Sequence, residues 1–299
     1  MKLIQSEINK RYSADTESRR LFHGRGHCFP GYEDLLIDSF KPVVFVTLYC
    51  QRDEGWLERL VNVLRLEVVS AEVILLQERY LQNCPSRILF GELPDEVNAI
   101  EASLKYRLRL HGAQNIGFFP DMIQGRNLVR KIAAGKSVLN LFSYSCSFSV
   151  VAIAAGAKHV VNLDMNRGAL ELGRLNHRLN DLDLRQASFL HMELFRSFSK
   201  LNKLAPFDLI VCDPPADQGN NFQSQRDWSR IIRKLPVLLN SGGDVLICLS
   251  SPYLYPEYIQ QLFSKLCPQA QLIEIVNSGE DFPELIVDKG LNILHYKIN

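Results

Sequence analysis

Residues 138–150 read VLNLFSYSCSFSV, an apolar run that stops at small polar residues, and a second apolar run, VVNLD at 160–164, follows it. Two strand-like segments joined by a helix, with a carboxylate closing the second, are typical of the unit that holds a ribose in nucleotide-binding α/β folds. No glycine occurs between Gly135 and Gly156. The stretch is therefore either a nucleotide cradle built without glycines or plain core.

Strand and helix patterns alternate from about residue 138 onward, which predicts an α/β fold with a parallel sheet covered on both faces. The expected strands are 137–142, 159–164, 186–193, 207–212 and 241–251, and the expected helices are 147–157, 167–182, 224–239 and 255–266. Two prolines stop the fourth strand, because proline lacks the amide that a central strand needs. A closing pair of strands at 270–279 and 291–299 predicts that an antiparallel strand finishes the sheet.

The first hundred residues show a different pattern. Strand-like runs at 43–50, 66–80 and 88–94 have few long helical stretches between them, which predicts a smaller, β-rich α+β domain. Alternating polar and apolar residues at 105–121 predict a strand or hairpin that joins the two domains. We place the domains at residues 1–111, with substrate recognition as a candidate role, and at residues 112–299.

The composition limits the class of protein. The 299-residue chain has 46% hydrophobic and 22% charged residues, which is typical of a soluble globular protein. A net charge of +1 favours no partner by itself, so a nucleic acid must be argued from local patches. The seven cysteines include no C-x-x-C pair, and the sequence has no signal-peptide core and no apolar segment near the length of about 20 residues that a membrane span needs. These features predict a cytoplasmic protein without membrane contact. The spacing of histidines and cysteines predicts no metal site.

The turn after the first strand discriminates between ligands. A dinucleotide needs its pyrophosphate to approach backbone amides closely, which the glycines of a G-x-G-x-x-G loop allow. Ser145, Cys146, Ser147 and Phe148 give no such access. S-adenosylmethionine carries adenosine and an amino-acid tail but no phosphate, so small residues with side chains suffice at its turn. The sequence therefore favours S-adenosylmethionine over NAD.

Two acids at predicted strand ends are candidates for contact with adenosine. Asp164 ends the second strand, where an ionised carboxylate accepts hydrogen bonds from both ribose hydroxyls; alternatively, it caps the helix that follows. Glu193 ends the third strand, where it reaches the adenine amino group, or it is a solvated loop acid. The sequence leaves these alternatives open.

The stretch CDPP at 212–215 follows the fourth strand, at the edge of the sheet where ligands collect in such folds. In methyltransferases that act on planar amines, an acid or amide before two prolines presents a carboxylate and a rigid carbonyl to the nitrogen that is methylated, and such positioning lowers the barrier to transfer. The alternative is a turn that only ends the strand. Together with Asp164 two strands away, the stretch favours the functional interpretation.

Together these residues resemble the ribosomal RNA large-subunit methyltransferases of the I and K type, a class I S-adenosylmethionine-dependent family that modifies bases of large-subunit rRNA. The likeness covers most of the chain, and four motifs in the same order carry it: HGRGHCFPG at 23–31, QNIGFFPDM at 114–122, NLFSYSCSFSV at 140–150 and DPP at 213–215. The resemblance implies a Rossmann-like domain with a mostly parallel seven-stranded sheet and an antiparallel last strand. It also implies S-adenosylmethionine as the cofactor and RNA as the partner.

Carried over residue by residue, the resemblance implies a cofactor site and a substrate site. The implied cofactor-binding residues are Phe119, Asp121, Phe142, Ser143, Tyr144, Ser145, Asp164, Met165, Glu193, Leu194 and Asp213. Phe119 and Asp121 would border the methionine end of the cofactor, and Asp164 would hold its ribose. The implied catalytic residues, which would face the substrate, are Asp213, Pro214 and Pro215.

The sequence departs from the family pattern in four respects, one of which is Ile123 in the place of the arginine of a D-x-R element that starts at Asp121. The family commonly begins with an RNA-binding PUA domain, whereas this sequence starts almost directly before HGRG. The aromatic residue that often follows DPP and can stack a flipped-out base is missing, which leaves Phe222 or Trp228 as substitutes. Relatives that methylate carbon five of cytosine need a cysteine nucleophile; here Ser250 stands in that place, with Cys248 two residues earlier.

Basic residues on three stretches are candidates for contact with RNA phosphates. They are Lys105, Arg107, Arg109 and His111; Arg126, Arg130 and Lys131; and Arg226, Arg230, Arg233 and Lys234. Each stretch is equally well a solvated face whose charges pair with acids.

The sequence as a whole predicts an S-adenosylmethionine-dependent methyltransferase that methylates a base nitrogen in RNA, with ribosomal RNA as the expected acceptor. The alternatives are methylation of cytosine C5, a non-RNA acceptor, or an RNA-binding protein that binds the cofactor without turnover. The oligomeric state stays open, a dimer included.

Overall fold

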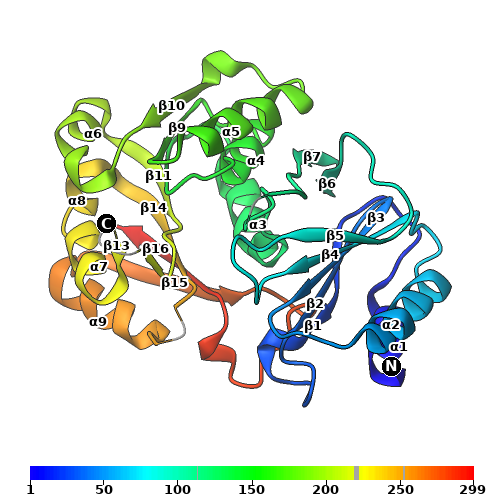
Figure 1. Ribbon diagram of the computed structural model, residues 1–299. Coiled ribbons are helices and arrows are strands. Elements are labelled where there is room, and N and C mark those ends of the chain that lie inside the picture. The colour runs from blue at the N-terminus through cyan, green and yellow to red at the C-terminus, as the bar shows by residue number, and fades with distance from the viewer. Residues whose placement is uncertain (113, 219–221, 252) are drawn as a thin grey trace. The chain divides into compact units, whose positions relative to one another are not determined.

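The computed structural model describes residues 1–112, 114–218, 222–251 and 253–299 of the chain. These residues form two compact units (Figure 1). The first unit comprises Met1–Pro120 with Glu280–Leu285, and the second comprises Asp121–Gly279 with Ile286–Asn299. The domain boundary expected between residues 111 and 112 lies before the observed division at Pro120 and Asp121. The sequence pattern did not indicate that residues 280–285 belong to the first unit.

The second unit is built on a seven-stranded sheet with the order β10-β9-β8-β11-β14-β16-β15. Its strands are β8 (Ser137–Leu141), β9 (His159–Asp164), β10 (Ala187–His191), β11 (Phe207–Cys212), β14 (Leu239–Leu249), β15 (Ala270–Asn277) and β16 (Asn292–Ile298). The strands from β10 to β14 pair in parallel, whereas β16 runs antiparallel to both of its neighbours. The predicted α/β fold with an antiparallel last strand is thereby confirmed.

Helices lie on both sides of this sheet, with α3 to α5 on one side and α6 to α9 on the other (Figure 1). They are α3 (Ile123–Ile132), α4 (Ser147–Ala154), α5 (Arg167–Leu179), α6 (Phe198–Leu204), α7 (Ser224–Ile232), α8 (Leu235–Leu238) and α9 (Pro256–Leu266). Because helices cover both faces, central strands read as nearly continuous apolar runs, and every residue of β11 except Asp208 is buried. A short ladder of β12 (Asp217–Gln218) and β13 (Phe222–Gln223) follows β11. Along the described parts of the chain, no helix combines the length and the apolar character needed to cross a membrane.

The first unit contains a five-stranded sheet with the order β1-β2-β3-β4-β5 and a separate hairpin of β6 and β7. Its elements are α1 (Lys2–Arg11), β1 (Arg19–His23), β2 (Leu35–Phe40), β3 (Val43–Leu48), α2 (Glu54–Glu67), β4 (Val73–Glu78), β5 (Ser86–Phe90), β6 (Asn98–Glu101) and β7 (Leu104–Arg107). The parallel pair β3 and β4 is connected through α2, and the other neighbours in the sheet are antiparallel. The unit is a β-rich α+β domain, as the sequence predicts.

The helices of this unit differ from the expectation. The sequence predicted few long helical stretches in this unit, and neither α1 nor α2 was expected. α2 extends to Glu67, although a strand was expected from residue 66. Asp53 caps α2 by accepting a hydrogen bond from the amide of Trp56. The helix buries leucines at helical spacing, namely Leu57, Leu60 and Leu64. This apolar face favours helix through residue 67, and β4 begins only at Val73.

The HGRGHCFPG motif receives the returning segment 280–285 within the first unit. The carbonyl of Gly26 accepts a hydrogen bond from the amide of Leu285 at 2.8 Å. A Cβ atom added at Gly26 would lie 1.8 Å from the carbonyl oxygen of Pro283. The close approach of two backbones therefore requires glycine at position 26, and the motif has a structural role.

Candidate active site

The carboxyl ends of the parallel strands meet at one edge of the sheet in the second unit. Leu141 of β8 lies opposite Leu163 of β9 and Cys212 of β11. Because these strands are parallel and in this register, the segments that follow them start side by side. Predicted site residues that this register brings to one edge are Phe142, Asp164, Glu193 and Asp213.

The turn after β8 adopts backbone conformations that usually need glycine. Phe142, Tyr144 and Cys146 have φ angles of +56°, +45° and +61°. This left-handed region costs a residue with a side chain roughly 1–2 kcal/mol, and strain of this kind clusters at functional sites. The stretch therefore forms a strained turn at the sheet edge rather than plain core, although it contains no glycine.

Amides of this turn donate hydrogen bonds within the protein. Ser143 donates to the Leu163 carbonyl at 3.1 Å, and Tyr144 donates to Asp164 Oδ2 at 2.8 Å. Cys146 donates to the Ser143 carbonyl at 2.7 Å. A pyrophosphate would need such amides for its own oxygens. The turn therefore fits an adenosine ligand without phosphate, such as S-adenosylmethionine, better than a dinucleotide.

Cys146 fits into the turn because α5 has a glycine beside it. A Cβ atom added at Gly173 would lie 2.4 Å from the Cys146 sulfur. The thiol is fully buried, and burial raises its pKa to about 12. A thiol that stays neutral packs against its neighbours and does not react as a nucleophile.

Asp164 is held by two backbone amides and is not the cap of α5. Its Oδ2 accepts from Tyr144 N at 2.8 Å and its Oδ1 from Asn166 N at 2.7 Å. The cap of α5 is Asn166, whose side chain accepts from Ala169 N. Burial raises the pKa of Asp164, and the two amides oppose that shift because they stabilise the charged form. Each carboxylate oxygen keeps room for a second hydrogen bond, so the group can still accept from two ribose hydroxyls.

Glu193 is an oriented carboxylate rather than a freely solvated one. It accepts hydrogen bonds from the amides of Phe195 and Arg196, both at 2.9 Å, and so caps the short 3-10 helix η4 (Leu194–Arg196). Leu194 is buried in the core, whereas Met165 is 39% exposed. The contact of Glu193 with adenine stays a prediction, and so does the assignment of Met165 and Leu194 to the cofactor site.

Asp213 follows β11 as a half-buried residue, before a buried Pro214 and an exposed Pro215. Burial raises the pKa of its carboxyl group to about 8. The negative charge of Asp121 raises this pKa further, and the Arg126 guanidinium opposes the shift. Asp121 therefore lies close enough to act on the charge of Asp213. Arg126 is fully buried on α3, so the expectation that it contacts phosphates on the surface is wrong.

The cysteines near Asp213 are buried thiols. Cys212 and Cys248 have no exposed surface. Burial raises the pKa of both thiols well above the usual value, and the charge of Asp213 adds to the shift. A nucleophilic cysteine needs a lowered pKa and access to the substrate. Neither thiol has the environment of a nucleophile.

The two aromatic residues that were expected to stack on a base are buried, so their rings cannot contact one. Phe222 and Trp228 are each 1% exposed, and the Phe222 ring packs edge-on against Phe142 with centroids 5.4 Å apart. Both therefore belong to the core, and the suggestion that they replace the aromatic after DPP is wrong. Phe119, at the end of the first unit, is 40% exposed, and Tyr253, which the sequence did not single out, is 75% exposed.

A buried chain of hydrogen bonds links β8, β9, α4 and α5 next to the strained turn, and sequence reasoning missed it. The chain runs from Asn140 to Asn162 (2.9 Å), Ser149 (3.0 Å), His177 (3.0 Å) and the Gly173 carbonyl (2.7 Å). Since a carbonyl only accepts, His177 donates from Nδ1 and accepts from the Ser149 hydroxyl at Nε2. Burial lowers the pKa of His177, which favours this neutral ring. The available signal was one asparagine inside each of two apolar strand runs.

Three features define the class of protein as a class I methyltransferase fold with an adenosine-binding edge. They are the order of the seven-stranded sheet, the turn whose amides already donate hydrogen bonds within the protein, and the acids at the ends of the neighbouring strands. The chain belongs to the S-adenosylmethionine-dependent methyltransferase family, which matches residues 19–297. Its cofactor is S-adenosylmethionine.

Individual relatives agree with this assignment. Ribosomal RNA large subunit methyltransferase I of Aeromonas salmonicida is 31% identical across 66% of this chain and 52% of its own length. The protein of the same name from Cronobacter sakazakii is 28% identical across 89% of this chain and 70% of its own length. The chain thus spans about half the length of the first relative. The resemblance to this family is confirmed.

Solved structures show the same fold. The crystal structure of a methyltransferase complexed with S-adenosylhomocysteine superposes with a TM-score of 0.89 at 24% identity, covering 99% of this chain and 80% of the other. The complex of aTrm5 and tRNALeu has a TM-score of 0.62 at 17% identity, covering 88% and 72%. The similarity extends over nearly the whole chain in the first case.

Proposed function

We propose that this protein transfers a methyl group from S-adenosylmethionine to a base nitrogen of ribosomal RNA. The names of the relatives support ribosomal RNA as the acceptor. The observation that carries the assignment to nitrogen is the carboxyl group of Asp213, whose pKa of about 8 lies near neutral pH at the edge of the sheet. A side chain whose pKa lies near the working pH is well suited to accept a proton.

The residues of the edge divide the work of binding and transfer. When bound, the cofactor supplies a methyl group activated on a sulfonium. Asp164 would accept from the ribose hydroxyls, Glu193 would accept from the adenine amino group, and Asp121 would border the methionine end together with Phe119.

Asp213 would orient the base nitrogen that attacks. The nitrogen forms a bond to the methyl carbon as the carbon–sulfur bond breaks, and its proton passes to the Asp213 carboxylate. Pro214 and Pro215 restrict the backbone on which this carboxylate sits. The protein thus needs to position one nitrogen and accept one proton.

The environment of the cysteines argues against transfer to cytosine C5. An unactivated cytosine carbon needs prior addition of a thiolate to the ring. Cys248 is fully buried with a raised pKa, and Ser250 occupies the position at which related carbon methyltransferases carry the nucleophile. Transfer to a nitrogen needs no such adduct.

Part of the basic surface is occupied within the protein. Arg107 binds both carboxylate oxygens of Glu96 at 2.6 and 2.7 Å. Arg226 and Arg230 bind the fully buried Asp227 at 2.6 and 2.8 Å. We assign phosphate contacts to exposed basic residues, namely Lys105, Arg109, His111, Lys131, Arg233 and Lys234. The first unit, which carries the first three of them, would serve substrate recognition.

We also propose that the protein acts in the cytoplasm. All seven cysteines are free thiols, which is the usual state in a reducing compartment. Ribosomal RNA as acceptor is consistent with that location.

A transfer assay with product analysis tests the proposal. The chain is incubated with labelled S-adenosylmethionine and ribosomal RNA from cells that lack its gene, and the RNA is digested to nucleosides. We expect label in a nucleoside methylated on a base nitrogen. Label in 5-methylcytidine would show that the acceptor atom is carbon and not nitrogen. Binding of S-adenosylhomocysteine without methyl transfer to RNA would show that the protein binds the cofactor but does not methylate RNA.

A further inference from the structure

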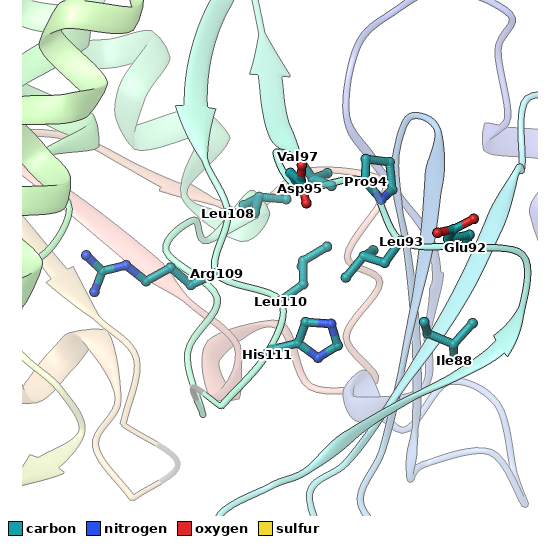
Figure 2. A pocket seen from close by; sticks show the side chains of 10 residues that line it. All are labelled: Ile88, Glu92, Leu93, Pro94, Asp95, Val97, Leu108, Arg109, Leu110 and His111. Carbon is teal, nitrogen blue, oxygen red and sulfur yellow. The ribbon is translucent and has the colours of Figure 1, made fainter.

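The first unit contains a cavity to which the proposed methyl transfer assigns no role. Its volume is about 540 Å³, within the range of about 300–1,000 Å³ that is typical of small-molecule sites. Figure 2 shows the cavity between Ile88 of β5, the segment 92–97 and the residues 108–111 that follow β7. All of these residues belong to the first unit, so the cavity is complete within it.

Apolar side chains form most of the wall. They are Ile88, Leu93, Pro94, Val97, Leu108 and Leu110. Val97, Leu108 and Leu110 are buried, whereas Ile88 is 43% exposed, so the cavity has a buried apolar floor and an open side. Such a wall suits the faces of a planar ring, whose transfer out of water is favourable.

Two carboxylates add acceptors to this apolar wall. Glu92 and Asp95 line the cavity and are exposed. Neither makes a hydrogen bond or an ion pair with any described residue. An ionised carboxylate only accepts hydrogen bonds, so a ligand that satisfies these groups must bring donors.

The stretch that closes the cavity carries the opposite charge. The Arg109 side chain extends away from the other lining side chains (Figure 2), and Lys105 and His111 on the same stretch are exposed as well. Acceptors in the cavity and cations outside it match a nucleotide that places an amino-bearing base inside and its phosphates outside. A lysine or arginine side chain of a protein partner would instead meet like charges on its way in.

We propose that this cavity binds one nucleotide of the RNA substrate and selects bases with an exocyclic amino group, namely adenine, cytosine and guanine, over uracil. The apolar wall covers the faces of the base, Glu92 or Asp95 accepts from its amino group, and Lys105 and Arg109 contact the phosphates. This inference rests on the proposed function in one respect, that the substrate is RNA. It assigns to the first unit a recognition site of its own.

Binding of short RNA oligomers to the full chain tests this inference. Fluorescence anisotropy at constant salt compares labelled oligoadenylate, oligocytidylate and oligouridylate of equal length. We expect the wild-type chain to bind the adenine and cytosine oligomers about tenfold more tightly than the uracil oligomer, the lower end of what a good base contact provides. The double variant Glu92→Gln/Asp95→Asn should bind all three oligomers with similar affinity.

A matched variant separates base selection from general electrostatics. Glu58→Gln/Glu72→Gln removes the same charge from two exposed residues of the first unit that do not line the cavity. The control variant should bind every RNA somewhat more tightly, because it loses two negative charges. In the cavity variant the same gain is offset for adenine and cytosine by the loss of the contacts to their amino groups. The ratio of adenine to uracil affinity should fall only in the cavity variant, while both variants keep the wild-type affinity for S-adenosylhomocysteine.

The outcomes distinguish this inference from the proposed function. Equal binding of all oligomers by a wild-type chain that still methylates RNA would overturn the cavity assignment alone. A base preference without methyl transfer would support the cavity and contradict the enzyme assignment. An arginine-rich peptide that binds the wild-type chain but not the cavity variant, with no base preference in either, would show that the cavity takes a cationic protein segment instead.

Discussion

Asp164 ends β9 and Asp213 directly follows β11, two parallel strands of the same sheet, yet the protein surrounds them differently. Asp164 accepts two backbone amides at 2.7 and 2.8 Å, which favour its charged form against the effect of burial. The pKa of the Asp213 carboxyl group is raised to about 8, first by burial and then by the negative charge of Asp121. The pKa values of both carboxyl groups are raised by burial, but only Asp164 has backbone amides that oppose the shift, so the protein favours the charged form of Asp164 more than that of Asp213.

The backbone segments around the two acids also differ in how they are held in place. The turn after β8 is strained at Phe142, Tyr144 and Cys146 and is fixed by its own hydrogen bonds. The segment after β11 is held by prolines. The proposed binding half, around Asp164, is therefore rigid, and the proposed transfer half, around Asp213, titrates. Substitutions in each half should have different consequences.

The largest effect is expected from Asp213→Ala in the transfer half. It should lower methyl transfer by about 10²- to 10⁴-fold, the range for losing a general base, and leave the affinity for S-adenosylhomocysteine nearly unchanged. Single-turnover rates and calorimetry of the same preparation measure the two quantities.

The cysteine variants provide the control for this prediction. Cys248→Ser and Cys146→Ser should retain activity, because both thiols are buried and neutral. Loss of turnover in Cys248→Ser with both ligands still bound, or a covalent complex with RNA that contains fluorocytosine, would replace the nitrogen mechanism by the carbon mechanism.

The second prediction concerns stability in the transfer half. Because the pKa of Asp213 is about 8 in the folded protein, against an ordinary value of 3.8 for an aspartate, its contribution to stability is full below about pH 4 and is lost as the pH rises through about 8. Asp213→Asn removes this titration and should stabilise the protein at pH 9 by a few kcal/mol relative to wild type, at about 1.4 kcal/mol per pKa unit. Urea unfolding at pH 5 and pH 9 checks it; the same pH dependence in both proteins would contradict the raised pKa.

The third prediction concerns the binding half. Asp164→Ala should weaken the binding of S-adenosylhomocysteine by about 1–3 kcal/mol, the scale for loss of a charged acceptor. Asn166→Ala is the matched control, since it removes the cap of α5 beside Asp164 but no proposed ligand contact. If calorimetry gives equal affinities for Asp164→Ala and wild type, Asp164 only braces the turn.

The last prediction concerns the packing of the strained turn against α5, where no loss of ligand binding or turnover is expected. Gly173→Ala should cost about 1–3 kcal/mol of stability through overpacking, because the new Cβ meets the Cys146 sulfur. Cys146→Gly in the same chain should restore most of the loss, since it removes that sulfur. Thermal or urea unfolding of the two single variants and the double variant forms a double-mutant cycle; additive effects would show that the two positions do not interact.

The sequence by itself determined the class of the second unit. Apolar runs such as VLNL and FDLIVC are buried on both faces, so their pattern predicts strands directly. The acids at strand ends could be predicted as well, because parallel strands bring their carboxyl ends to one edge whatever the details of packing. In the first unit α1 and α2 were not expected, although α2 carries leucines at helical spacing, because the expected strand-like run 66–80 overlapped its last two residues.

Only the tertiary structure decided what each group at that edge can do. The pKa of Asp213 depends on Asp121 and Arg126, which are far from it in the chain. Phe222 and Trp228 cannot stack on a base because both are buried, and no local sequence pattern reveals that burial. The fit of Cys146 depends on Gly173 of α5, a contact between residues that the chain separates by a helix and a strand. Desolvation, charge coupling and packing act through space rather than along the chain, and for that reason the residue types were predictable while their chemical states were not.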